Sequence, residues 1–204
     1  MSPRRALGPL PAVAAVLAVA ACAAPSEPAD PAEVADAAAR WGAAPQHVLT
    51  TSAEGFEAVP MAAGAYGADG FSLAFSDAAT GSTFLLTSVG GTMTAEDCAD
   101  GPLTDTSGGS VEGAVTCAED GELLHRTAGE AEEYVVVRDG SVVRVSGTRA
   151  DHDALREAAE GVRVPTSAEL TDLVAEAPPA QEPVERGDLP PGDGAPDNSV
   201  GVGG

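Results

Sequence analysis

The fold is decided by residues 134–145, Tyr-Val-Val-Val-Arg-Asp-Gly-Ser-Val-Val-Arg-Val. Two runs rich in β-branched residues flank the dipeptide Asp139-Gly140. An Asp-Gly pair between two such runs is typical of a two-residue type I′ turn, in which both central residues have positive φ. The stretch therefore predicts a β-hairpin and, with it, an antiparallel sheet.

Upstream residues supply further strands for this sheet. In residues 71–76, Phe and Leu alternate with small residues, which is the period of a strand that is buried on one face. Other strand-like runs are expected at residues 47–51, 56–61, 83–89 and 123–127. Because these runs follow one another with short turns between them, we expect a meander.

Helix signals lie on both sides of the strands. Asp30, Pro31 and Glu33 form a capping box with proline in the first turn, and an apolar face follows up to Trp41. Residues 151–161 and 166–174 show similar start and stop signals. The predicted fold class is α+β: an antiparallel β-meander sheet with an N-terminal helix and one or two C-terminal helices.

The start of the chain has the parts of an export signal. Arg4 and Arg5 precede a short apolar run that ends in Val19-Ala20-Ala21-Cys22. These four residues resemble the lipobox of bacterial lipoproteins, and the lysine-free, Ala- and Gly-rich composition suggests an actinobacterial member of that class. The resemblance implies that Cys22 is acylated, becomes the mature N-terminus and anchors the protein to the membrane outside the cytoplasm. The alternative is an ordinary cleaved signal with a cysteine near its end.

These signals divide the chain into four parts. We expect a signal peptide at 1–21, a tether at 22–30, one α+β domain at 31–176 and a disordered tail at 177–204. The tail is acidic and rich in Pro and Gly, so it can bury too little apolar surface to offset its chain entropy.

Charge and cysteine content limit the classes of partner. The chain carries 32 acidic against 10 basic residues, a formal net charge of −22. Such a surface repels nucleic acid and anionic lipid, so we expect no nucleic-acid partner and a membrane link through acyl chains alone. Cys98 and Cys117 are predicted to form a structural disulfide, with free thiols or a redox couple as the alternative.

No motif for catalysis, a cofactor or a metal is evident, and none of the three is expected. The three histidines lie far apart in the sequence, at His47, His125 and His152. The run 151–153, Asp-His-Asp, is interpreted as helix capping rather than a metal site. Asp97, Asp100 and Asp105 lack EF-hand spacing, which weakens a calcium interpretation.

The order of elements in a lipid-anchored envelope protein is similar to that of LolA/LprG-type lipoproteins, in which a curved antiparallel sheet wraps helices and can hold acyl chains. This resemblance implies that the inner face of the sheet lines a cavity, although a filled core is an equal alternative. The residues concerned are Phe71, Leu73, Phe75, Phe84 and Leu86. We expect a non-enzymatic binding or interaction module with an envelope protein or lipid as partner. The alternatives are a lipid or glycolipid carrier and a carboxylate-based hydrolase of the cell wall.

Overall fold

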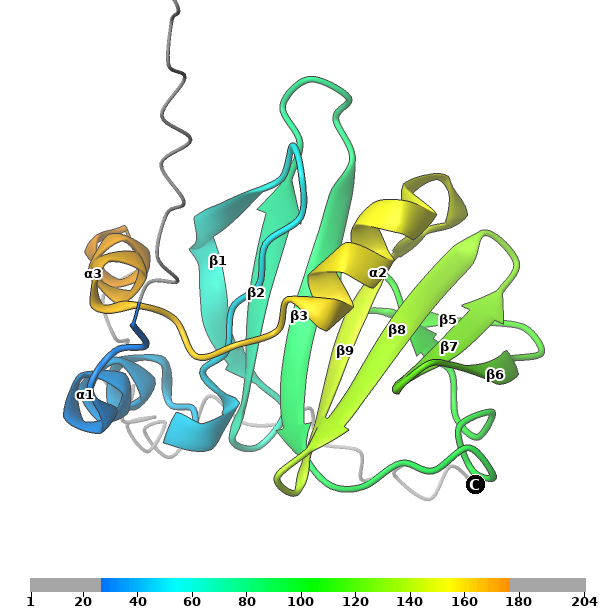
Figure 1. The fold of residues 1–204 in the computed structure, drawn as a ribbon, viewed down its shortest axis with the longest axis horizontal. Coiled ribbons are helices and arrows are strands. Elements are labelled where there is room, and N and C mark those ends of the chain that lie inside the picture. The colour runs from blue at the N-terminus through cyan, green and yellow to red at the C-terminus, as the bar shows by residue number, and fades with distance from the viewer. Residues whose placement is uncertain (1–26, 177–204) are drawn as a thin grey trace, which may run out of the picture.

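A computed structural model describes residues 27–176 and places them in an α+β fold with one large antiparallel sheet (Figure 1). Cys22, the signal peptide, most of the tether and the predicted tail lie outside the described residues. Within residues 27–176, no helix is long and apolar enough to cross a membrane.

The main sheet has seven antiparallel strands in the order β1-β2-β3-β9-β8-β7-β6. It consists of two meanders, β1–β3 and β6–β9, that join where β3 pairs with β9. A small two-stranded sheet, β4–β5, lies in the segment between the meanders. The strands are β1 Glu57–Tyr66, β2 Gly70–Ser76, β3 Thr83–Gly90, β4 Leu103–Thr104, β5 Ser110–Val111, β6 Thr116–Asp120, β7 Leu123–Ala128, β8 Ala131–Arg138 and β9 Ser141–Thr148.

The hairpin that decides the fold forms as predicted. Asp139 and Gly140 have φ values of 49° and 76°, as a type I′ turn requires. The turn sets the register of β8 and β9, in which Arg138 lies opposite Ser141. Both strands lie in the interior of the sheet.

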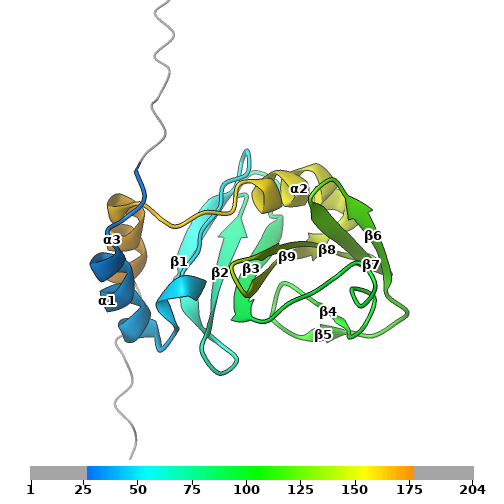
Figure 2. The same ribbon diagram turned by 60° about the horizontal axis from the view of Figure 1, so that its bottom comes forward.

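Three α-helices flank the strands. They are α1 Pro31–Trp41, α2 His152–Glu160 and α3 Ser167–Ala175, and two short 3₁₀ helices, η1 Pro45–His47 and η2 Arg149–Asp151, accompany them. The predicted capping boxes of Asp30 with Glu33 and of Thr166 with Glu169 are both present. Figure 2 shows α1 and α3 together beside β1, with α2 and the β4–β5 pair on opposite faces of the sheet.

The prediction of a strand at residues 47–51 is wrong. Pro45 begins the turn of η1, and only Thr50 makes a strand-like bridge, to Arg163. His47 points into the protein, where its Nδ1 lies 3.2 Å from the hydroxyls of both Ser88 and Ser141. Residues 47–51 are all buried, so this segment passes through the core. It therefore cannot be a strand that buries one face and exposes the other.

The hydrophobic core has two parts, one on each face of the sheet. The larger part joins the sheet to all three α-helices, and Trp41 contacts Phe71 with ring centroids 4.9 Å apart. The smaller part lies on the opposite face around Cys98, Leu124 and Val135. The five residues considered as a cavity lining all belong to the larger part and are at most 2% exposed: Phe71, Leu73, Phe75, Phe84 and Leu86. They pack as a core, in which Phe75 stacks on Phe84 at 4.7 Å.

Candidate functional site

A disulfide joins Cys98 to Cys117, with a Cα–Cα distance of 5.9 Å. It ties the segment between the two meanders to the edge strand β6. Disulfides persist in oxidising compartments, so this bond favours a location outside the cytoplasm. The bond between Cys98 and Cys117 confirms the predicted disulfide.

A buried ion pair fixes the same segment to the interior of the sheet. Arg126 on β7 is 1% exposed and pairs with Glu133 on β8, which is fully buried. The guanidinium also donates to the carbonyl oxygens of Cys98 (2.6 Å) and Gly101 (2.9 Å). Ser146 donates to the second carboxylate oxygen of Glu133 at 3.0 Å, so both charges have polar partners.

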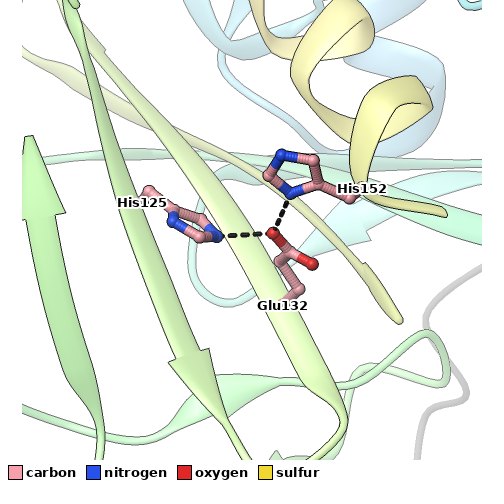
Figure 3. A group of neighbouring side chains, drawn as sticks. All are labelled: His125, Glu132 and His152. Carbon is pink, nitrogen blue, oxygen red and sulfur yellow. Dashed lines mark hydrogen bonds and ion pairs between the residues drawn. The ribbon is translucent and has the colours of Figure 1, made fainter. Parts of the chain in front are cut away.

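On the other face of β7 and β8, three side chains converge: His125, Glu132 and His152 (Figure 3). His125 lies opposite Tyr134 in the β7–β8 pair, and Glu132 lies two residues before Tyr134 on the same face of the sheet. His152 begins α2, which packs on this face. The tight turn between β7 and β8 and the docking of α2 therefore build the cluster from three elements.

The geometry of the cluster centres on one carboxylate oxygen. Glu132 Oε1 lies 2.5 Å from Nε2 of His125 and 2.6 Å from Nδ1 of His152 (Figure 3). The Glu132 side chain is 3% exposed, whereas those of His125 and His152 are 26% and 48% exposed. A buried carboxylate thus lies beneath two solvent-accessible imidazoles.

The buried side chain of Tyr134 packs against this cluster. Its ring stacks on that of His125 with centroids 4.7 Å apart and planes 19° apart, which fixes the orientation of the imidazole. Burial, followed by the charges of Asp120 and Glu132, raises the pKa of Tyr134 to about 12. The phenol therefore stays protonated and neutral at physiological pH.

A surface pocket of about 480 Å³ opens over the cluster, and its lining adds Thr116, Thr127 and Arg149 to the three converging residues. The hydroxyls of Thr116 and Thr127 bond to each other at 2.7 Å. The pocket therefore combines two imidazoles, a carboxylate, a hydroxyl pair and one arginine.

The other residues considered from the sequence do not join this cluster. Asp97 and Asp105 accept backbone N–H groups of their own turns, from Thr94 and from Gly109 respectively. The Ser107 hydroxyl first, and then the Gly109 N–H, bond to the Asp105 carboxylate and lower its pKa. Asp151 makes no capping bond to α2 and instead accepts from the Thr148 hydroxyl at 2.8 Å.

Sequence patterns alone do not reveal this cluster, because its three residues are separated along the chain and meet only in the folded structure. The available signal is the alternation of side chains in the β7–β8 hairpin, in which residues two positions apart lie on the same face of the sheet. Once Ala128 is paired with Ala131 across a tight turn, His125 and Glu132 fall on the same face of the sheet. The arrival of His152 depends on how α2 docks, which no local pattern specifies.

No family model, curated protein or solved structure matches this chain.

Proposed function

We propose that this protein is a lipid-anchored binding protein of the cell envelope and that it acts without catalysis. The single observation that carries the proposal is the convergence of His125, Glu132 and His152 beneath an open pocket. The disulfide and the lipobox-like ending at Cys22 support the location. The sheet and helix that position the three side chains form a preorganised binding site.

Binding is favoured over hydrolysis by the state of the groups in the pocket. Both imidazoles are bonded to the same carboxylate oxygen, and neither of these bonds joins a base to a hydroxyl nucleophile. The Thr116 and Thr127 hydroxyls bond to each other. The Tyr134 hydroxyl lies 3.4 Å from Asp120 Oδ2 and 3.5 Å from Nδ1 of His152, and it is held protonated because burial raises its pKa to about 12. A hydroxyl nucleophile needs a base that takes its proton, and the raised pKa of Tyr134 opposes that transfer, so these contacts favour binding.

The anchor is tested by feeding cells radiolabelled palmitate and isolating the protein. Wild type and Ser26→Ala, a control outside the lipobox-like motif, should be labelled, whereas Cys22→Ala should not. Label that persists on Cys22→Ala, or is missing from wild type, would refute the anchor.

One structural feature, an open and partly apolar pocket, supports the alternative function of a lipid carrier. Phe75 also borders an open pocket of about 370 Å³, whose apolar lining includes Phe56, Pro60 and Leu173. Native mass spectrometry of the full chain should show no stoichiometric lipid if the filled core excludes acyl chains. A lipid adduct lost in Leu173→Trp would make carriage the better interpretation, and turnover of a wall polymer would refute the non-catalytic role.

A further inference from the structure

We infer that His125, Glu132 and His152 form a binding site for a divalent transition-metal ion of the zinc class. The three protein ligands are Nε2 of His125, Oε1 of Glu132 and Nδ1 of His152, which lie within 4.8 Å of one another. This inference rests on the proposed binding role and names the chemical class of the ligand.

The donor set selects the class of metal. Two imidazole nitrogens and one carboxylate oxygen form a ligand set that zinc enzymes use with a fourth position open, and we assign it here to binding rather than to catalysis. Calcium and magnesium prefer shells made of oxygen, so two nitrogen donors select against them. The pocket above the cluster lies on the side where a fourth ligand, such as water, would bind.

The charge balance of two neighbouring glutamates indicates that a cation belongs at this site. Glu133, on one face of β8, is neutralised by Arg126 and has Arg144 at 3.7 Å. Glu132, on the other face, is just as buried but has two imidazoles as its ion-pair partners. A buried carboxylate needs a compensating charge, and an ion shared by Glu132 and both imidazoles would supply it.

The observed geometry is close to that of a loaded site. Ligand atoms about 2.0–2.2 Å from a tetrahedral zinc ion lie roughly 3.3 Å from one another. The two contacts of Glu132 Oε1 at 2.5 and 2.6 Å must therefore widen by less than about 1 Å. His152, which is half exposed on the first turn of α2, can make this movement by a side-chain rotation.

The overall charge of the chain favours cations, although Arg149 also lines the pocket, and one ligand is held in place. The net charge of −22 raises the local concentration of divalent cations. Stacking on Tyr134 keeps the His125 ring directed at Glu132. The two ligands on the sheet are therefore held close together, and metal binding requires both imidazoles to move slightly away from Glu132 Oε1.

The test is metal titration of the purified full chain by isothermal calorimetry, first with Zn²⁺ and then with Co²⁺, whose visible spectrum reports coordination. Wild type should bind one Zn²⁺ per chain, and Co²⁺ should give the absorption of a four- or five-coordinate site. Ca²⁺ and Mg²⁺ should not compete. His125→Gln, Glu132→Gln and His152→Gln should each weaken binding by more than the roughly 10–100-fold that loss of an outer-shell partner costs.

Asp153→Asn is the matched control, because it removes an exposed charge next to His152 and leaves the three ligands intact. It should bind Zn²⁺ like wild type. Circular dichroism establishes that each variant is folded. Absence of stoichiometric Zn²⁺ binding by wild type, or affinity unchanged in all three glutamine variants, would overturn the metal site. Neither result would affect palmitate labelling, so the proposed envelope location is tested separately from the metal site.

Discussion

Replacing Arg126 by methionine should destabilise the protein more than any surface charge substitution. Arg126 is 1% exposed, and its guanidinium is the main partner of the fully buried Glu133. Removing one member of a buried pair leaves the other charge uncompensated, which costs about 3–5 kcal/mol. Arg144 at 3.7 Å and the Ser146 hydroxyl at 3.0 Å remain near Glu133, so we expect the lower half of that range.

The free energy of unfolding should be measured by urea denaturation of the oxidised chain, followed by circular dichroism and tryptophan fluorescence. Arg156→Met serves as the matched control. Its side chain is 45% exposed and its pair with Asp120 spans 3.4 Å, so its loss should cost about 0–1 kcal/mol. The double variant Arg126→Met with Glu133→Met should recover much of the loss, because a buried pair can be replaced by apolar side chains of similar size.

Two results would refute this reasoning. One is a cost for Arg126→Met no greater than that for Arg156→Met. The other is a double variant whose loss equals the sum of the two single losses, since that would mean the two charges are not coupled.

Three further predictions concern the disulfide, acid stability and metal linkage. Replacing Cys98 and Cys117, 19 residues apart, by alanine should lower the free energy of unfolding by about 3 kcal/mol in urea titrations, whereas an unchanged midpoint would contradict a structural role. The Arg163 guanidinium, followed by bonds from Thr166, lowers the pKa of Glu169 from 4.5 to about 2. Glu169 therefore adds stability that is complete above pH 4.5 and is lost as the pH falls toward 2, so Glu169→Gln should flatten this part of the stability–pH profile. Zn²⁺ at 100 times its Kd should raise the free energy of unfolding by about 2.7 kcal/mol in wild type and not in Glu132→Gln; equal shifts would contradict the site.

Local sequence patterns were enough to predict the elements whose structure depends on neighbours in the chain. The Asp139-Gly140 turn and the two capping boxes form as predicted because their hydrogen bonds and φ angles involve residues within four positions. The disulfide was predictable because two cysteines remained once Cys22 was assigned to the lipobox-like motif.

Long-range features could not be derived in the same way. The pairing of β3 with β9 joins residues 51 to 61 positions apart, and no turn chemistry specifies it. The segment at residues 47–51 carries a strand-like composition, yet burial of His47 between Ser88 and Ser141 overrides it. The metal-type cluster depends on the docking of α2, which is set by packing across the whole face of the sheet.

The most direct test of the proposed site is a crystal structure of the protein grown with Zn²⁺, with diffraction data collected on both sides of the zinc absorption edge. We expect one anomalous peak per chain, about 2.0–2.2 Å from Nε2 of His125, Oε1 of Glu132 and Nδ1 of His152. A pocket without a peak, with Glu132 still bonded to both imidazoles, would contradict it.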